Sequence, residues 1–100
     1  MNLHSRKLLV VVAEAALEKR LITDLRREGA QGYTVHDVRG GSEHAVREGF
    51  WEADRTIELK VVCDEAVAQR LAAHVLAQYA PHFGVTLFLS DVAVFRPEKF

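Results

Sequence analysis

The 100-residue sequence has a single cysteine, no excess of charge of either sign and no long apolar run. Because Cys63 has no second cysteine to pair with, a disulfide within the chain and any CxxC motif are excluded. No apolar run approaches the roughly 18 residues of a membrane-spanning helix. A formal net charge of −1 gives no general attraction to nucleic acid or to an anionic membrane. We therefore expect a cytoplasmic protein with no nucleic-acid partner and no direct membrane insertion.

Metal-ligand motifs are also missing. The five histidines are His4, His36, His44, His74 and His82. They show no HxxxH, HxH or Cys/His spacing, so we expect no metal site. His74 and His82 are expected in helix-flank packing and in a turn.

The composition is that of a globular domain, with 49% apolar residues in a chain long enough for one core. Short apolar runs predict strands over residues 7–13, 32–39, 56–63 and 85–95. Cys63 continues the alternating apolar face of the third strand, which favours a small core residue over a reactive thiol.

Two helices are expected between these strands. Leucine recurs every fourth residue over residues 17–25, which predicts a helix with Glu14 in its first turn and Gly29 at its end. Asp64 is a good N-cap for the second helix, which ends before Pro81.

The order βαββαβ is typical of the ferredoxin-like α+β fold, in which two helices cover one face of a four-stranded antiparallel sheet. The first and last strands are apolar nearly throughout, whereas a solvated face would alternate. The face without helices is therefore expected to be covered by a partner. We expect residues 1–100 to form one domain and its copies to form a homo-oligomer with their sheets packed inward.

A connection of about 16 residues, 40–55, joins the second and third strands, and loops of this length are usually functional or disordered. It begins with Gly40-Gly41-Ser42, which is either a flexible turn or a set of backbone N–H groups that bind an anion. Arg47 is either a solvated side chain or a planar fork for phosphate or bicarbonate.

Two other features of the loop carry open interpretations. The aromatic pair Phe50-Trp51 is either an interface hot spot or a segment folded back onto its own oligomer. His44 would make ligand binding sensitive to pH near neutrality.

Beyond the loop, Glu58 and Lys60 share the polar face of the third strand. They form either an exposed ion pair of little energetic value or the border of a ligand cleft.

Several stretches resemble the PII signalling family, and together they span essentially the whole chain. KLLVVV (residues 7–12) resembles its first strand, and DVA (91–93) the end of its last strand. The most specific piece is EGAQGYTV (28–35) followed by VRGGS (38–42), which resembles the turn, the second strand and the start of the T-loop. The resemblance is to the PII-like branch associated with carboxysomes and bicarbonate transport.

The resemblance implies a non-enzymatic homotrimer that binds an adenine nucleotide in the clefts between subunits. It implies a T-loop, about residues 40–55, that changes shape with ligand and contacts a partner protein. Bicarbonate is implied as a further ligand, and a bicarbonate transporter or carboxysome-related protein as the partner to which this bacterial protein is recruited. The residues implied for the nucleotide are Thr34, Gly40, Gly41, Ser42, Arg47, Glu58, Lys60, Gly84 and Arg96, and those for the partner are Phe50 and Trp51. Within that set Glu58 is expected to meet a ribose hydroxyl and Lys60 a phosphate.

The sequence departs from nitrogen-sensing PII proteins in two places. Pro81-His-Phe-Gly84 stands where those proteins have a Gly-Asp-Gly-Lys phosphate loop, so AMP or ADP is expected in preference to ATP. The T-loop has no tyrosine, so uridylylation is not expected.

Other proteins share this order of elements. A dimeric α+β-barrel enzyme, such as a small monooxygenase or isomerase, would use His36 or His44 as an acid–base group and would have no affinity for nucleotide. An amino-acid-binding domain of the ACT kind usually lacks so long a loop. An RNA-recognition domain would have basic, aromatic central strands, which this chain does not have.

Overall fold

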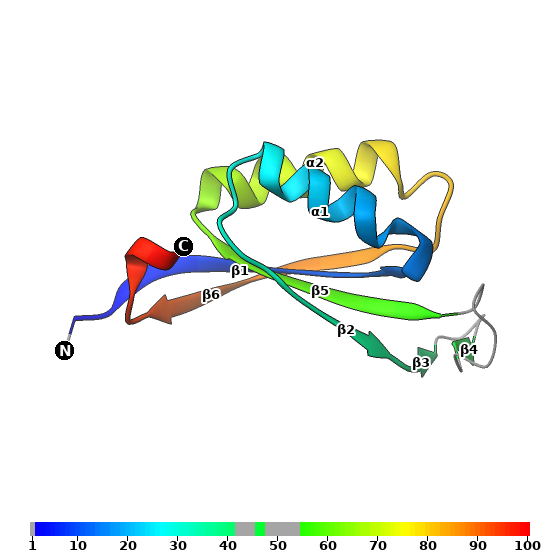
Figure 1. Cartoon of the computed structure of the whole chain (residues 1–100), viewed down its shortest axis with the longest axis horizontal. Coiled ribbons are helices and arrows are strands. Elements are labelled where there is room, and N and C mark those ends of the chain that lie inside the picture. The colour runs from blue at the N-terminus through cyan, green and yellow to red at the C-terminus, as the bar shows by residue number, and fades with distance from the viewer. Residues whose placement is uncertain (1, 42–45, 48–54) are drawn as a thin grey trace.

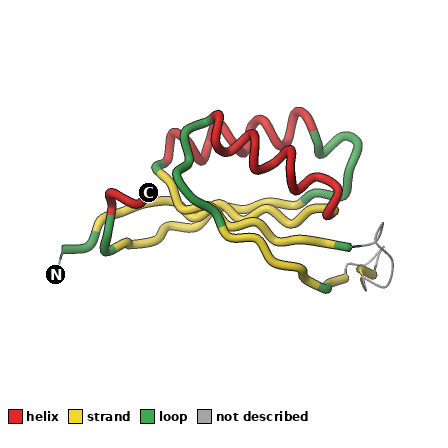
Figure 2. Tube along the Cα trace, in the orientation of Figure 1, coloured by secondary structure: helices red, strands yellow, loops and turns green. Residues whose placement is uncertain are grey.

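The computed structural model describes residues 2–41, 46–47 and 55–100. A four-stranded sheet runs through the molecule, with all neighbouring strands antiparallel in the order β2-β5-β1-β6. The strands are β1 (His4–Glu14), β2 (Thr34–Val38), β5 (Thr56–Cys63) and β6 (Thr86–Val94). The helices α1 (Glu18–Arg27) and α2 (Glu65–Gln78) both cover the same face of this sheet (Figure 1, Figure 2). The expected ferredoxin-like α+β fold is confirmed.

Beyond β2 the chain continues into a second, two-stranded ladder at one end of the molecule. Its strands are β3 (Gly40–Gly41) and β4 (Val46–Arg47), in which Gly40 pairs with Arg47 and Gly41 with Val46. The C-terminus, with the short helix η3 (Pro97–Lys99), lies at the opposite end of the sheet (Figure 1).

The first helix begins later than the sequence predicts. A short 3₁₀ turn, η1 (Ala15–Leu17), precedes α1, and Glu14 is the last residue of β1 instead of a residue in the first turn of the helix. Glu14 stays extended because it pairs with Thr56 of β5 and because its carboxylate accepts a hydrogen bond from the backbone N–H of Gly84. The expectation for Glu14 was therefore wrong.

The ends of both helices follow from identifiable residues. Gly29 has φ of +100°, the left-handed conformation that lets glycine close α1. At the start of α2, Asp64 Oδ1 accepts a hydrogen bond from the backbone N–H of Val67 at 2.9 Å. Both predictions are confirmed.

The core lies between the sheet and the helices. Side chains on the helix-covered face of β1 and β5 pack against one stripe of each helix, and the largest of them are Leu9, Val11, Ile57, Leu59, Val61, Leu17, Leu21, Leu25, Leu71 and Val75. Full burial of one such side chain stabilises the fold by about 1.5–3 kcal/mol. Cys63 belongs to this core, and burial raises the pKa of its thiol, as expected for an unreactive cysteine.

The opposite face of the sheet has no helix over it. Val10 pairs with Lys60 on one side and with Phe88 on the other, so all three side chains are on this open face. Phe88 is 56% exposed, although it lies in the middle of a strand. The expected apolar outer face is therefore present, which favours association of copies through it. None of the described helices is long and apolar enough to cross a membrane.

Candidate functional site

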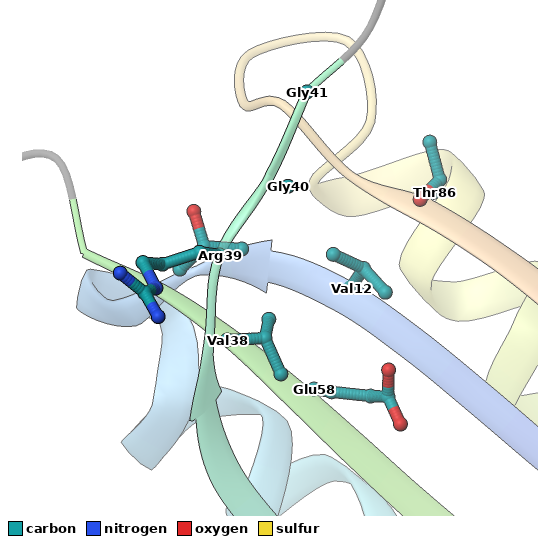
Figure 3. A pocket seen from close by; sticks show the side chains of 8 residues that line it. Val12, Val38, Arg39, Gly40, Gly41, Glu58 and Thr86 are labelled. Atoms are coloured by element: carbon teal, nitrogen blue, oxygen red, sulfur yellow. The ribbon is translucent and has the colours of Figure 1, made fainter. Parts of the chain in front are cut away.

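A cavity of about 390 Å³ lies at the end of the sheet from which β2 leads into the loop (Figure 3). It is lined by Val12, Val38, Arg39, Gly40, Gly41, Thr56, Glu58 and Thr86. Its wall thus combines two apolar side chains, two hydroxyls, a carboxylate and glycine backbone, while the side chain of Arg39 points away from the other lining side chains (Figure 3). A polar ligand with one apolar part suits such a wall.

Strand register brings five of these residues together from the four strands of the main sheet. Glu58 of β5 pairs with Val12 of β1, and Val12 pairs with Thr86 of β6, so one row across the sheet supplies three of the lining side chains. In the next row Val38 pairs with Thr56. Residues directly opposite one another on paired strands point to the same face, which places these five side chains on the open face.

Gly40 and Gly41 line the cavity, as the expected phosphate-binding role requires. Their conformation differs from the expectation, however, because both residues are extended and pair with β4. A nest of successive N–H groups needs alternating right- and left-handed residues, and Gly29 is the glycine with positive φ in the described part of the chain. The backbone therefore contributes an extended edge to the cavity instead of a nest at these two positions.

Glu58 is the acidic side chain of the cavity, and two basic groups lie beside it. Lys60 Nζ is 3.3 Å from Glu58 Oε1, and His36 Nε2 is 3.7 Å from the same oxygen. His36 and Glu58 are direct partners across β2 and β5. The predicted pairing of Glu58 with Lys60 on one face is confirmed, and His36 is added to it.

Two other predicted residues lie near the cavity without lining it. Thr34 pairs with Lys60, one row further from the cavity than Glu58. Gly84 precedes Thr86 at the start of β6, and its backbone N–H donates to Glu14 Oε2 at 2.9 Å. An anionic ligand would therefore meet the Glu14 carboxylate at this position.

Arg96 lies at the other end of the molecule. It follows β6, whose length of nine residues separates it from Thr86 by about 25 Å or more. Its Nε is 3.4 Å from Glu98 Oε1. In one subunit Arg96 thus cannot reach the cavity, and only a neighbouring subunit could bring it there.

The remaining predictions fall where side chains are not described. Ser42, His44, Phe50 and Trp51 lie outside the described residues. Arg47 is described only by its backbone pairing with Gly40, at the mouth of the cavity.

Several lining residues were missed in the sequence, namely Val12, Val38, Arg39, Thr56 and Thr86. The four residues other than Arg39 could have been found only from the strand register, because Thr86 becomes a neighbour of Glu58 only through Val12 of the intervening strand. Arg39 could have been predicted from the sequence, because it directly precedes Gly40. Among the described residues, no group of three or more His, Cys, Asp or Glu side chains could hold a metal ion.

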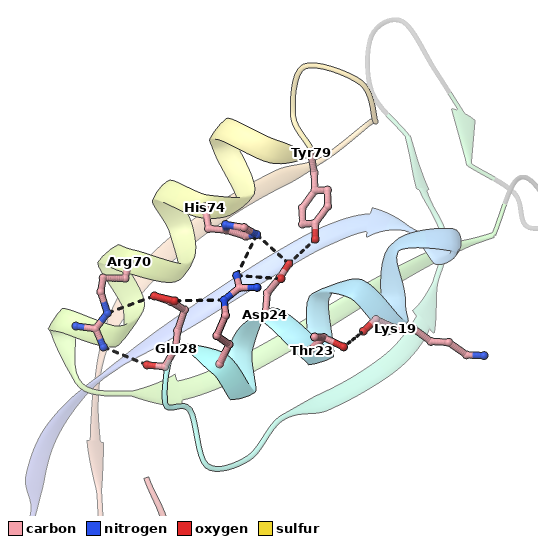
Figure 4. Close-up of polar contacts among 8 residues, drawn as sticks. Lys19, Thr23, Asp24, Glu28, Arg70, His74 and Tyr79 are labelled. Carbon is pink, nitrogen blue, oxygen red and sulfur yellow. Dashed lines mark hydrogen bonds and ion pairs between the residues drawn. The ribbon is translucent and has the colours of Figure 1, made fainter.

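A second polar cluster lies between the two helices, away from the cavity (Figure 4). Asp24 is only 4% exposed, and it accepts a hydrogen bond from the Tyr79 hydroxyl. The other two partners of Asp24 are His74 Nε2 at 3.2 Å and Arg27 Nη2 at 3.1 Å. Burial and the hydrogen bond to Asp24 raise the pKa of Tyr79 to about 12. His74 also contacts the Tyr79 ring edge-on, which agrees with the packing role expected for it.

The family of nitrogen regulatory protein P-II matches residues 6–99 of the chain. The chain belongs to the PII family. A search of curated proteins found no significant match.

Solved structures of PII-like proteins superpose on the chain over nearly its whole length. A PII-like signalling protein from Thermus thermophilus is 37% identical, with a TM-score of 0.87 over 100% of this chain and 99% of that one. CPII, a nitrogen regulatory PII-like protein from Thiomonas intermedia solved with ADP, AMP and bicarbonate, is 27% identical, with a TM-score of 0.88 over 99% and 96% of the two chains. A DUF3240 protein from Shewanella baltica, at 18% identity and a TM-score of 0.66 over 84% of this chain and 86% of that one, shares the fold.

Proposed function

We propose that this PII-family protein is a signalling module that binds AMP or ADP in clefts between the subunits of a homotrimer. The observation that carries the proposal is the cavity at the base of the T-loop, where Gly40, Gly41 and Glu58 converge on the open face. A PII-like relative of the same fold was solved with ADP, AMP and bicarbonate bound. The apolar open face supports association of copies, which would enclose the cavity.

The polarity of the cavity suits a nucleotide. The Gly40–Gly41 backbone lies near the start of the loop, and Arg47 pairs with Gly40 there, so we assign this end of the cavity to phosphate. Val12 and Val38 offer an apolar surface for the base, and Glu58 an acceptor for a ribose hydroxyl. In the trimer Arg96 of a neighbouring subunit supplies a further cation, while Thr34, Lys60 and Ser42 border the cleft.

The preference for AMP or ADP over ATP rests on charge. A third phosphate needs additional cations or free N–H groups, and this chain lacks the Gly-Asp-Gly-Lys loop of nitrogen-sensing PII proteins. At Gly84 the backbone N–H is held by the Glu14 carboxylate, which repels an added phosphate. Bicarbonate is the proposed second ligand.

Signalling then works by population shift. A ligand that contacts the start of the T-loop stabilises one loop conformation over others by its difference in affinity for them. The partner, a protein of inorganic-carbon metabolism such as a bicarbonate transporter or a carboxysome-related protein, reads that conformation through Phe50 and Trp51. No chemical step is required, so we propose no enzymatic activity.

The alternative, a dimeric α+β-barrel enzyme with His36 or His44 as acid–base group, has less support. His36 contacts Glu58 at 3.7 Å but is not among the residues that line the cavity. Family membership favours signalling.

Calorimetric titration of AMP, ADP, ATP and cyclic AMP, each with and without bicarbonate, tests the proposal. We expect micromolar binding of AMP and ADP, weaker binding of ATP, and tighter nucleotide binding with bicarbonate. Light scattering should give about three times the chain mass of 11.2 kDa. A dimer with no heat from any nucleotide would refute the proposal and favour the enzyme.

A further inference from the structure

The loop that joins α2 to β6, residues 81–84, uses its own backbone N–H groups. It begins with a proline, which has no N–H group. The N–H groups of residues 82–83 both donate to the carbonyl oxygen of Tyr79, at 3.0 and 2.9 Å. The N–H group of Gly84 donates instead to a side chain, with Glu14 Oε2 at 2.9 Å. A backbone N–H group that binds a carboxylate oxygen can bind a phosphate oxygen in the same way.

Strand register places Glu14 at one end of the cavity. Glu14 shares a face of β1 with Val12, which lines the cavity, because residues two apart on a strand point to the same face. It pairs with Thr56, a second lining residue, across strands that are about 5 Å apart. Thr56 also pairs with Val38, from which the chain runs on to Gly40. Glu14 therefore borders the end of the cavity that we assign to phosphate.

Resting on the proposed nucleotide site, we infer that Glu14 is the specificity residue that limits the ligand to two phosphates, because its carboxylate occupies the Gly84 N–H group in place of a ligand phosphate. A third phosphate has to displace this carboxylate to reach the N–H group. It also comes to lie beside a negative charge, which opposes its binding. The residue thus selects nucleoside mono- and diphosphates, both by occupancy and by charge.

The rest of the loop is fixed independently of Glu14. The carbonyl oxygen of Tyr79 accepts two of the loop's N–H groups, and its hydroxyl donates to the buried carboxylate of Asp24. These contacts lie on the helix side and remain when the Glu14 side chain is changed. A substitution of Glu14 therefore releases the N–H group of Gly84 and leaves the shape of the loop in place.

The experiment is calorimetric titration of ADP and of ATP, at pH 7 and equal ionic strength, into the natural protein, Glu14→Gln, Glu14→Ala and Glu65→Gln. Glutamine removes the charge and keeps an acceptor for Gly84, whereas alanine removes both. Glu65→Gln is the matched control, because Glu65 is an exposed carboxylate at the start of α2, beyond the opposite end of β5 from Thr56. The ratio of the ATP Kd to the ADP Kd, measured on one preparation, cancels differences in the folded fraction. Thermal melts confirm that each variant is folded.

We expect the natural protein and Glu65→Gln to bind ATP more weakly than ADP. The ratio of the two Kd values should fall about 5-fold in Glu14→Gln and about 10-fold in Glu14→Ala, because both the charge and the occupied N–H group oppose the third phosphate. The fall should come from tighter ATP binding, with the ADP Kd within about 2-fold of its natural value. A residue that only stabilised the loop would instead lower the melting temperature and change both affinities alike.

An unchanged ratio in both Glu14 variants, with ADP still bound, would overturn the inference and leave nucleotide binding standing. A ratio that fell equally in Glu65→Gln, or that fell only because ADP bound more weakly, would also overturn it. Absence of nucleotide binding in the natural protein and in every variant would instead overturn the proposed function, and the inference with it.

Discussion

Two carboxylates of this protein, Asp24 and Glu58, have similar neighbours but differ in burial. Asp24 lies between the helices with Tyr79, His74 and Arg27, and its two oxygens are both engaged. Glu58 lies on the open face, where its Oε1 is 3.7 Å from His36 Nε2 and 3.3 Å from Lys60 Nζ. The first cluster is closed and buried, whereas the second borders a cavity. A carboxylate, a histidine and a cation thus form either a structural cluster in the core or the border of a cavity, according to their burial.

The largest expected effect is on the closed cluster. Asp24→Ala should lower the free energy of unfolding by about 3–5 kcal/mol, because it leaves the Tyr79 hydroxyl and Arg27 without their buried acceptor. Urea unfolding at fixed protein concentration measures this change. The matched control is Asp37→Ala, which removes an exposed ion pair with Arg55 and should cost less than about 1 kcal/mol. Equal costs for the two variants would mean that burial does not distinguish the carboxylates.

The next effect concerns the open cluster. Glu58→Gln should weaken ADP binding about 10-fold or more and change the free energy of unfolding by less than about 1 kcal/mol, because its ion pairs are partly exposed. Calorimetry and urea unfolding of one preparation measure both quantities. The comparison of the two carboxylates would fail if this variant lost stability and kept its affinity.

A smaller effect is the pH dependence of the closed cluster. The pKa of Tyr79 is raised to about 12 in the folded protein, above its ordinary value of 10. As pH rises, the Tyr79 hydroxyl therefore loses its proton at lower pH in the unfolded chain than in the folded protein. Its contribution to the free energy of unfolding is complete below pH 10 and is lost as pH rises toward 12. Unfolding between about pH 9 and 12 should show this loss in the natural protein and in Tyr33→Phe, which changes an exposed tyrosine. Tyr79→Phe should lack it.

The fold was predictable because its signals are local. Alternation in residues 56–63 gave the strand β5 with its observed bounds, and Asp64 and Gly29 marked helix ends through capping chemistry that depends on neighbouring residues alone. The error at Glu14 has a long-range cause, since its partners Thr56 and Gly84 are remote in the sequence.

The site was predictable only in part, for the same reason. Gly40, Gly41 and Glu58 were named from the resemblance and from strand alternation, and they line one cavity. Thr86 and the contact of His36 with Glu58 depend on which strands are neighbours and in what register, which alternation alone does not fix. Arg96 was named from the resemblance but lies far from the cavity in one subunit, so its proposed role requires a second subunit.

The most direct test of the central claim is the structure of the protein crystallised with ADP. The account predicts ADP in the cavity of the open face, with its phosphates beside Gly40 and Gly41 and a ribose hydroxyl within hydrogen-bond distance of the Glu58 carboxylate. The Asp24 cluster should be unchanged. ADP bound elsewhere on the protein, or bound in this cavity without contact to Glu58, would contradict the account.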